Sequence, residues 1–473
     1  MPSQAIRTFV TVFLLALAGC GSGRAAPGVG EEPPPGQLLE TAEQRIERHR
    51  MADVVVEVLD AAGQPVEDAD VRVEQQSHAF LFGCNLYMWG KCPSEELEQA
   101  YRLRFADLFN FATLGFYWGS YERQRGEPRD DQRRAAEWCR RHRIHTKGHP
   151  LAWTLVEPEW LPNDPQEVVK LQLGRIRREV TEYKGLIDCW DVVNEPSYFD
   201  RDQTREDSPR LTRAWERVGN IEFIRRCLAT AREANPKATL LVNDYCHTRT
   251  FARVLDRLRV DGARPFDAIG LQSHMHREPW SNEKTWEVCQ RFARFDVPLH
   301  FTEVTILSGR EGWEAPEDEP AWPSTPRGER RQAEQVERFY TMLFSHPAVE
   351  AITWWDLSDR GAWKDAPAGL LRADMSPKPA YEVLQRLIQQ TWHTRATRRT
   401  DAAGRVRLRG FLGDYSVAVE TADGTRTGQR FTLRKNDENR WTIRLPDEDG
   451  PATGGGSWSS DATNATGRPP SQN

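Results

Sequence analysis

The segment Ile187-Asp-Cys-Trp-Asp-Val-Val-Asn-Glu-Pro196 begins as an apolar β-type run and ends in two polar residues, Asn194 and Glu195. Short runs of this kind alternate with amphipathic helical stretches over residues 80–392. Eight strand–helix pairs over that length favour an α/β fold built as a TIM (β/α)8 barrel rather than an open doubly wound sheet. No Gly-rich phosphate loop follows any of the runs, which weakens the case for a nucleotide-binding fold.

The expected barrel strands are short apolar segments. They cover residues 80–86, 109–114, 144–148, 187–193, 239–242, 266–271, 298–301 and 349–354. The last expected helix, 380–390, places Tyr381, Leu384 and Ile388 on one face.

The chain has 473 residues, a formal net charge of −6, and 38% hydrophobic residues, so it is long enough for two or three domains and apolar enough for a large core. It lacks the basic surplus of a nucleic-acid binder, and we expect no nucleic-acid partner. The 17 Trp residues suit sugar rings or a large buried core equally well.

The segments that flank the barrel are β-type. Residues 53–59 and 69–74 precede it, and residues 404–409, 413–420, 430–434 and 440–445 follow it. The pieces Asp60–Ala69 and Thr400–Leu408 resemble parts of one carboxypeptidase-regulatory-like β-sandwich. Because two strands cannot bury a face alone, we expect a single small accessory β-sandwich that is split by the barrel. Two independent appendages are the alternative.

The N-terminal segment has an apolar run, Phe9–Ala18, that is too short to span a bilayer and fits the core of a signal peptide. It ends Leu17-Ala-Gly-Cys20, which resembles the bacterial lipobox and implies lipidation of Cys20. An ordinary signal peptide is the alternative. The expectation is an exported protein with a lipid anchor to the membrane of a bacterial cell envelope. The expected organisation is a signal peptide 1–20, a flexible tether 21–50, N-terminal sandwich strands 51–79, a catalytic barrel 80–392, the C-terminal part of the sandwich 393–446, and a disordered tail 447–473.

Two glutamates follow expected barrel strands. Glu195 ends the fourth strand, and Glu303 follows Pro298-Leu-His-Phe-Thr of the seventh. Barrel enzymes carry their catalytic groups at the C-terminal ends of the strands, and strands three apart can face each other across the barrel mouth. Glycoside hydrolysis uses two carboxyl groups that flank one sugar linkage, so the pair indicates such chemistry.

Seven short motifs resemble family 10 of the glycoside hydrolases, the xylanase family, in family order over residues 80–390. They are Gly148-His-Pro-Leu-Ala-Trp153, Trp190-Asp-Val-Val-Asn-Glu-Pro196, Asn243-Asp-Tyr245, Gly270-Leu-Gln-Ser-His274, Phe301-Thr-Glu303, Trp354-Trp-Asp-Leu-Ser-Asp359 and Ser376-Pro-Lys-Pro-Ala-Tyr381.

The resemblance implies a role for each matched residue. Glu195 would be the general acid/base and Glu303 the nucleophile of a retaining mechanism. Asn194 would bind the sugar 2-hydroxyl, and His274 would hold the orientation of Glu303. The residues that would contact substrate are His149, Trp153, Asn194, Gln272, His274, Trp355 and Trp363. Asp191 and Asp359 are left without a role.

The segment Thr113–Glu122 departs from the family pattern. The family has a Glu-Asn pair and a Lys here, which bind the sugar beyond the cleavage point on the non-reducing side. Here Trp118 and Glu122 align, but Leu114–Tyr117 is apolar or aromatic. Thr154 also replaces a His, and Asp356 stands where Gly is usual. These changes leave open which β-glycan is cut.

The sequence therefore predicts a retaining glycosidase that cleaves β-1,4-xylosidic linkages in xylan or xylo-oligosaccharides. Alternatives are another β-glycan, a short xyloside, or a non-catalytic glycan-binding surface protein. The expected partner is a β-linked polysaccharide or oligosaccharide, with no cofactor and no metal. Seven cysteines besides Cys20 are scattered and are expected mostly as small buried residues. Neither disulfide pairing nor oligomeric state follows from the sequence.

Overall fold

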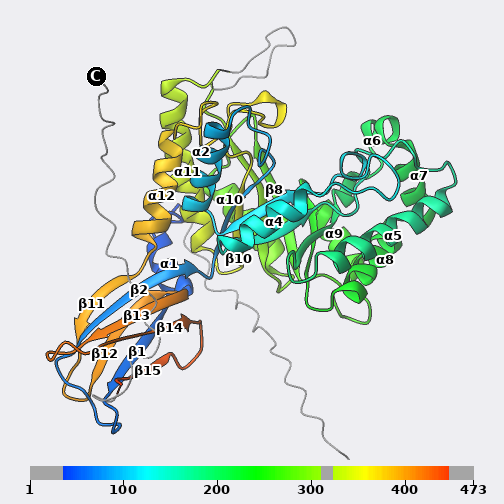
Figure 1. The fold of residues 1–473 in the computed structure, drawn as a ribbon. Helices are drawn as coiled ribbons and strands as arrows, with labels where there is room; N and C mark the ends of the chain where they lie inside the picture. The colour runs from blue at the N-terminus through cyan, green and yellow to red at the C-terminus, as the bar shows by residue number, and fades with distance from the viewer. Residues whose placement is uncertain (1–35, 310–322, 447–473) are drawn as a thin grey trace, which may run out of the picture.

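The computed structural model describes residues 36–309 and 323–446. They form a closed barrel surrounded by helices, with a smaller β-structure at one end (Figure 1). The eight barrel strands run in the order β10-β3-β4-β5-β6-β7-β8-β9, and neighbours are parallel. Their bounds are β3 (Leu81–Asn85), β4 (Phe111–Gly115), β5 (His145–His149), β6 (Cys189–Asn194), β7 (Thr239–Asp244), β8 (Ala268–Met275), β9 (Leu299–Ile306) and β10 (Val349–Trp354). The TIM barrel expected from the alternating pattern is confirmed.

Helices cover the outside of the barrel. They are α2 (Glu95–Leu108), α3 (Trp118–Tyr121), α4 (Asp131–Arg141), α5 (Pro165–Glu182), α6 (Asp202–Asp207), α7 (Pro209–Val218), α8 (Asn220–Ala234), α9 (Arg249–Leu258), α10 (Asn282–Ala293), α11 (Pro326–Ser345) and α12 (Pro379–Arg386). Side chains of Ser94, Asp164 and Ser281 accept backbone N–H groups at the first turns of α2, α5 and α10, which fixes where those helices begin. The expected last helix, 380–390, changes at its C-terminal end into a π-helical turn, η3 (Leu387–Thr391).

Two expected strands end too early. Strand β9 continues to Ile306, so Glu303 lies inside it rather than after it, and β8 continues to Met275 and includes Gln272 and His274. The expected strands are too short because, in the sequence pattern, polar residues near their C-terminal ends indicate the end of each strand. In a barrel such residues can continue the strand and face the barrel mouth.

The flanking segments pair with each other across the sequence. One sheet has the order β12-β1-β15 and the other β11-β2-β13-β14. Their bounds are β1 (Met51–Leu59), β2 (Asp70–His78), β11 (Arg395–Arg399), β12 (Arg405–Phe411), β13 (Gly413–Glu420), β14 (Arg426–Leu433) and β15 (Arg440–Arg444). Asp53 pairs with Arg409, and Val73 pairs with Val417. The two flanks therefore build one sandwich, and the alternative of independent appendages is wrong.

The sandwich core is mainly valine from alternate strand positions, which β-branched side chains suit. Its buried members include Val54, Val56, Val58, Val71, Val73, Val417, Val419, Trp441 and Ile443. Strand β11 was not expected from the sequence, because its residues Arg395–Arg399 are largely exposed and carry no apolar alternation.

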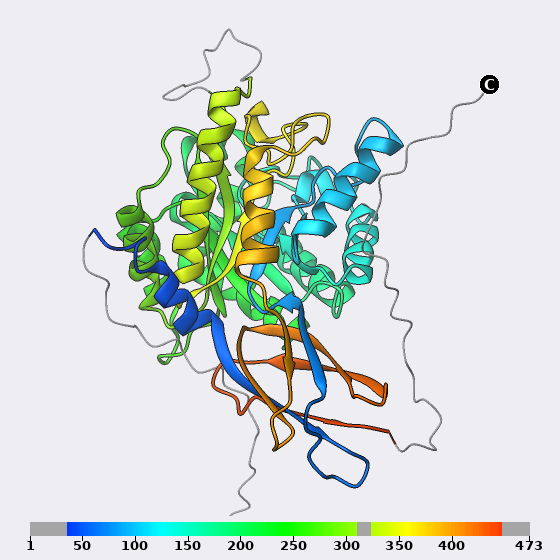
Figure 2. The same ribbon diagram turned by 90° about the vertical axis from the view of Figure 1, so that its left-hand side faces the viewer.

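The expected tether 21–50 is wrong over its last residues, which form helix α1 (Ala42–Arg50). Figure 2 shows α1 beside the lower end of α11, where the barrel meets the sandwich. Arg45 reaches Ser345, and Arg50 donates to the carbonyls of Phe344, His346 and Val349 at 2.6–2.7 Å. These partners lie about 300 residues away in the sequence, so local pattern could not reveal them.

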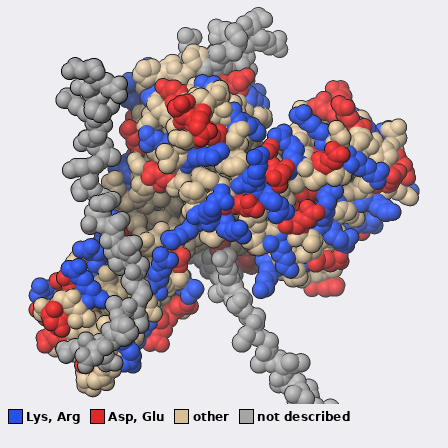
Figure 3. Space-filling view, viewed as in Figure 1, with Lys and Arg blue, Asp and Glu red and all other residues tan. Residues whose placement is uncertain are grey.

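A cavity of about 1300 Å³ lies between the sandwich and the N-terminal end of the barrel, lined by residues of both such as His78, Ile144 and Arg430. Lys and Arg are interspersed with Asp and Glu over the face shown in Figure 3. No helix within residues 36–309 or 323–446 is long and apolar enough to cross a bilayer. The expected signal peptide with Cys20 and the expected tail 447–473 lie outside the described residues.

Candidate active site

Glu195 and Glu303 lie at the C-terminal end of the barrel and are joined by a chain of side-chain amides. Gln272 Nε2 donates to Glu195 Oε1 and to Asn194 Oδ1, both at 3.2 Å. Asn243 Nδ2 donates to Asn194 Oδ1 at 2.8 Å and to Glu303 Oε1 at 2.9 Å. The two carboxylates are only 7% and 5% exposed. They therefore converge on one site.

Asn243 is a central member of this chain that the sequence analysis quoted in a motif without giving it a role. Thr302 donates to its Oδ1 at 2.6 Å, so the amide is held in one orientation. A Cβ on Gly270 of the neighbouring strand would lie 2.3 Å from Asn243 Oδ1. Glycine at position 270 is thus required for Asn243 to reach both Asn194 and Glu303.

Glu195 is placed by an unusual backbone conformation. Strand β6 ends at Asn194, and Glu195 has a positive φ of 56°, which turns the chain into the short helix η1 (Pro196–Tyr198). The Glu195 N–H donates to the carbonyl of Asn243 at 2.8 Å. Asp244 accepts from Ser197 N at 2.9 Å and fixes the segment that follows. Burial raises the pKa of Asp244 to about 7, although the backbone donors oppose that shift.

Glu303 is held as a carboxylate by its neighbours. His274 Nε2 lies 3.0 Å from Glu303 Oε2, and His149 Nε2 lies 3.9 Å from Oε1. Burial by itself would raise the pKa of Glu303, but the His274 hydrogen bond, together with His149 and Lys147, brings it below its ordinary value of 4.5. A nucleophilic carboxylate must be ionised, and this surrounding supplies that state.

Asp191, which the sequence left without a role, joins two buried residues below the site. Its Oδ2 lies 2.7 Å from Lys147 Nζ and 2.7 Å from His149 Nδ1. Burial would raise the pKa of Asp191, and Lys147 and His149 outweigh that effect and lower it. The arrangement fixes the ring of His149. Lys147 was missed by the sequence analysis, although it lies two residues before His149 and so faces the same side of β5.

The aromatic residues expected around the sugar lie at the same site. Trp355 is 5% exposed, and its ring centroid lies 5.7 Å from that of His149 and 6.2 Å from that of His274. Trp363 is 46% exposed and lies 4.6 Å from His274. Trp153 packs on Tyr117 at 5.7 Å. All seven expected substrate contacts are thus brought together with the two glutamates.

Arg201 is a residue near Glu195 that the sequence did not indicate. Its Nη2 lies 2.8 Å from Glu195 Oε2, without the alignment of a hydrogen bond. The guanidinium also lies 5.9 Å from the ring centroid of Tyr245. Arg201 precedes α6, and no periodic pattern places it there.

Asp356, at the position where the family has Gly, anchors the segment that carries the tryptophans. It accepts a hydrogen bond from the side chain of Asn85 and another from Trp363 N at 2.8 Å. Burial raises the pKa of Asp356. Since both carboxyl oxygens are engaged by the protein, this substitution serves to fix Trp363 relative to β3.

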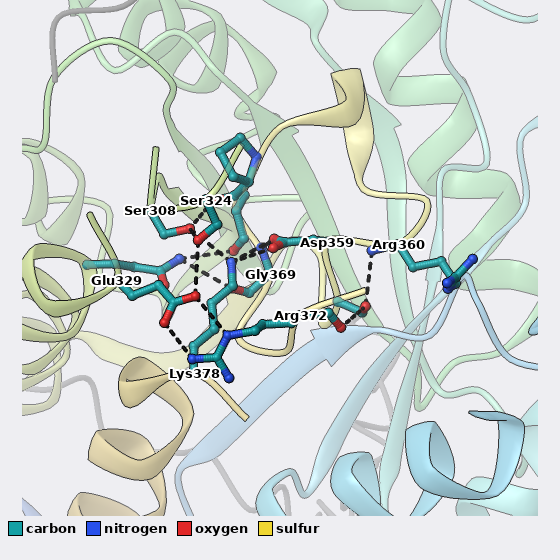
Figure 4. Close-up of polar contacts among 12 residues, drawn as sticks. Ser308, Ser324, Glu329, Asp359, Arg360, Gly369, Arg372 and Lys378 are labelled. Atoms are coloured by element: carbon teal, nitrogen blue, oxygen red, sulfur yellow. Dashed lines mark hydrogen bonds and ion pairs between the residues drawn. The ribbon is translucent and has the colours of Figure 1, made fainter. Parts of the chain in front are cut away.

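Asp359, which the sequence left without a role, takes part in a polar network (Figure 4). Lys378 Nζ donates to Asp359 Oδ1 at 2.7 Å and to Ser308 Oγ at 2.9 Å. Arg372 holds Glu329 of α11 through two hydrogen bonds of 2.9 and 2.6 Å. The network ties Asp359, in the segment after β10, to Ser308, in the segment after β9.

The part of the chain that the structure describes contains no cluster of three His, Cys, Asp or Glu side chains able to hold a metal ion. The cysteines at 84, 92, 139, 189, 227, 246 and 289 are all free, and five of the seven are buried.

Comparison with known proteins places this arrangement in a family. Residues 102–387 match the model of glycosyl hydrolase family 10. The chain belongs to that family. It is therefore a glycoside hydrolase, and its closed barrel is the fold of its relatives.

The individual relatives are distant. The endo-1,4-beta-xylanase B of Thermotoga neapolitana is 26% identical over 272 residues, which is 54% of this family 10 chain and 72% of the xylanase. The anti-sigma-I factor RsgI6 of Acetivibrio thermocellus is 26% identical over 421 residues, 87% of this chain. The chain spans only half the length of RsgI6.

A solved structure gives the same fold. Native xylanase 10B from Thermotoga maritima superposes with a TM-score of 0.54 at 22% identity, covering 66% of this chain and 96% of the xylanase. At this identity the match supports the fold alone.

Proposed function

We propose that this family 10 chain cleaves β-1,4-xylosidic linkages in xylan or xylo-oligosaccharides by a retaining, double-displacement mechanism. The observation that carries the proposal is the amide chain that joins Glu195 to Glu303 through Gln272, Asn194 and Asn243. The choice of xylan rests on the relatives, several of which are endo-1,4-beta-xylanases.

In the proposed first step, Glu195 gives its proton to the oxygen of the leaving sugar while Glu303 attacks the anomeric carbon. A glycosyl ester of Glu303 forms, and the shortened chain leaves. In the second step Glu195 takes a proton from water, the water oxygen attacks the anomeric carbon, and the bond to Glu303 breaks. The product keeps the β configuration.

The neighbouring residues serve this chemistry in the proposal. His274 and Lys147 favour the charged form of Glu303 before attack. Asn194, held by Asn243, binds the 2-hydroxyl in this proposal, a contact that strengthens in the transition state. His149 and Gln272 bind hydroxyls of the same sugar, and Trp355 and Trp363 form a wall.

A panel of β-glycans tests the proposal. Xylan and xylo-oligosaccharides should be hydrolysed, and proton NMR should detect the β-anomer of the new reducing end before mutarotation. Cellulose and mannan oligosaccharides are the matched comparison. Hydrolysis of these and not of xylosides would contradict the substrate assignment, and initial release of the α-anomer would contradict retention.

A non-catalytic glycan-binding protein is the second candidate, and it is disfavoured because binding alone does not need two buried carboxylates joined in this way. A glycan array with the purified protein, run beside the hydrolysis panel, separates the two. Binding without any hydrolysis would support the second candidate.

We also propose that the chain is exported and lipidated on Cys20, and that the sandwich braces the barrel. The sequence Leu17-Ala-Gly-Cys20 supports the first part. Hydrogen bonds from Arg50, the last residue of α1 and directly before β1, to carbonyls at the end of α11 support the second. Mass spectrometry of the membrane fraction, with Cys20→Ser as control, should detect an acylated Cys20. Its absence from the wild-type protein would contradict the anchor.

A further inference from the structure

Two tyrosines meet beside the candidate site, in the loops that follow β3 and β4. Tyr87 follows β3, and Tyr117 follows β4. Their hydroxyl oxygens are 3.2 Å apart, and their ring centroids are 5.9 Å apart in an edge-on arrangement. The pair thus bridges two neighbouring strands across their C-terminal ends.

Each ring also packs directly on residues proposed to hold the reacting sugar. The Tyr87 ring lies 5.0 Å from Trp355, and the Tyr117 ring lies 5.6 Å from His149 and 5.7 Å from Trp153. Burial raises the pKa of both hydroxyls, and the nearby charge of Glu303 adds to this. The tyrosine pair therefore packs directly against residues proposed to bind the reacting sugar and lies close enough to Glu303 to feel its charge.

The two residues of this segment that align with the family pattern, Trp118 and Glu122, are engaged inside the protein. Trp118 Nε1 donates to Glu122 Oε2 at 3.0 Å, and Arg178 donates to the same oxygen at 2.7 Å. Gly126 N donates to Glu122 Oε1 at 2.7 Å. Glu122 is 2% exposed. Although Trp118 and Glu122 align with the family pattern, they satisfy each other inside the protein.

The side next to Glu195 is different. Tyr198 and Tyr245 are stacked at 6.0 Å and are 43% and 38% exposed. Arg201 lies between this pair and Glu195. Since an acid/base residue touches the leaving group, this exposed aromatic pair lies on the side of the leaving chain. A flat, accessible aromatic surface suits successive sugar rings.

We infer that the enzyme accepts a single sugar unit on the non-reducing side of the cleaved bond, and so removes terminal β-xylosyl units from the non-reducing ends of xylo-oligosaccharides. The inference rests on the proposed function, which it narrows to chain-end action. The Tyr87–Tyr117 bridge blocks the glycone side, and the stacked Tyr198 and Tyr245 receive the rest of the chain.

The action pattern on xylopentaose reduced to its alditol tests this inference with the full chain. The alditol marks the original reducing end. The first products should be xylose and the tagged tetramer in equal amounts, followed by the tagged trimer. Early xylobiose or xylotriose together with short tagged products would overturn the inference and leave the proposed function standing. No hydrolysis of the pentamer or of an aryl β-xyloside would overturn the proposed function itself.

Variants of the tyrosine pair locate the cause. Tyr117→Ala and Tyr87→Ala should shift the first untagged product from xylose toward xylobiose. Tyr381→Phe is the matched control, because its hydroxyl bonds to Arg104 O on the outside of the barrel, and it should leave the xylose-first pattern unchanged. Folded alanine variants that release only xylose would contradict the blocking role of the pair. If both fail to fold, Tyr87→Phe, which keeps the ring and loses the Oη contact, should release more xylobiose than wild type, and an unchanged pattern would count against the bridge.

Discussion

The two ends of the barrel differ in what they bury. At the C-terminal end, buried polar groups surround a site: Lys147 forms an ion pair with Asp191, and the charge of Lys147 acts on Glu303. At the N-terminal end, aromatic rings meet: Phe344 lies 4.3 Å from Trp392 and 5.0 Å from Phe80. One end concentrates charge that costs free energy to bury, and the other concentrates apolar area that stabilises the fold.

This difference implies that one end of the barrel serves catalysis and the other end stabilises the fold. Helix α1 and the sandwich attach at the aromatic end, where Arg50 stacks on Phe80 at 4.8 Å. The candidate active site lies at the other end. Substitutions at the polar end should therefore change catalysis with little loss of stability, and substitutions at the aromatic end should do the reverse.

The largest expected effect is the loss of turnover at the polar end. Glu303→Ala should lower kcat by about 10⁴–10⁶-fold, the scale seen when a hydrolase loses its nucleophile. Glu195→Ala should lower it by about 10²–10⁴-fold on natural substrates. An aryl xyloside with a good leaving group needs no acid, so Glu195→Ala should cleave its bond at a nearly normal first-step rate, and added azide should trap the β-xylosyl azide.

The control for these variants is the melting temperature, which should not fall. If azide restored activity to Glu303→Ala and gave a β-xylosyl azide, the roles of the two glutamates would be reversed. If azide gave no β-xylosyl azide with Glu195→Ala, the acid/base role of Glu195 would be contradicted.

The next effect is on stability at the aromatic end. Trp392 is 3% exposed and stacks on Phe344. Trp392→Ala should lower the free energy of unfolding by about 3–5 kcal/mol, as expected for a large buried aromatic side chain. Urea denaturation measures this, and kcat/KM measured well below the unfolding transition should be unchanged. Leu103→Ala, at a 71% exposed position, should change neither quantity. A lower kcat/KM in folded Trp392→Ala would show that the two ends are coupled.

Sequence reasoning recovered the features that local pattern encodes. The alternating strands gave the barrel, and the polar residues that follow apolar runs gave Glu195 and Glu303. The pairing of the two flanks was expected because the two strands before the barrel cannot bury a face alone, and because pieces of both flanks resemble parts of one carboxypeptidase-regulatory-like sandwich. Helix α1 was missed since its contacts with Ser345 and Phe344 come from the far end of the chain.

The same limit applies to the site. Asn243 and Lys147 could have been proposed, because each occupies an inward position on a strand next to an expected site residue. Arg201 and the Tyr87–Tyr117 contact could not have been proposed from the sequence. These residues lie in loops, whose path is set by tertiary packing and not by a helical or strand periodicity. The sequence can thus predict the type of reaction, but not the loop residues that determine how many sugar units bind on each side of the cleaved bond.

A smaller effect concerns pH. The pKa of Glu303 lies below 4.5 in the folded protein, so the carboxylate remains charged as pH falls to that value, and the acid limb of kcat/KM should lie below pH 4.5. His274→Ala removes a hydrogen bond that favours the charged form, while the burial that raises the pKa remains. The acid limb should then move to higher pH. His274→Gln keeps an N–H donor and should move it less. If His274→Ala lowered kcat equally at every pH and left the acid limb of kcat/KM at the same pH, His274 would have a purely structural role.

The smallest effect is expected on the sandwich surface, where charge is exposed rather than buried. Arg409 Nη1 lies 2.9 Å from Asp53 Oδ1 across β12 and β1, and the two side chains are 41% and 80% exposed. The pair should contribute only about 0.2–1 kcal/mol, because water screens it and two long side chains must be ordered. A double-mutant cycle of Arg409→Ala and Asp53→Ala, followed by urea denaturation, isolates this coupling. High salt should reduce it further. Arg409 also donates to Glu47 O of α1 at 2.9 Å. Arg409→Ala alone should therefore lower the free energy of unfolding by slightly more than the coupling energy of the pair. A coupling above about 2 kcal/mol that salt leaves unchanged is outside the range of exposed pairs, and it would mean that charge, and not the valine core, holds the two flanks together.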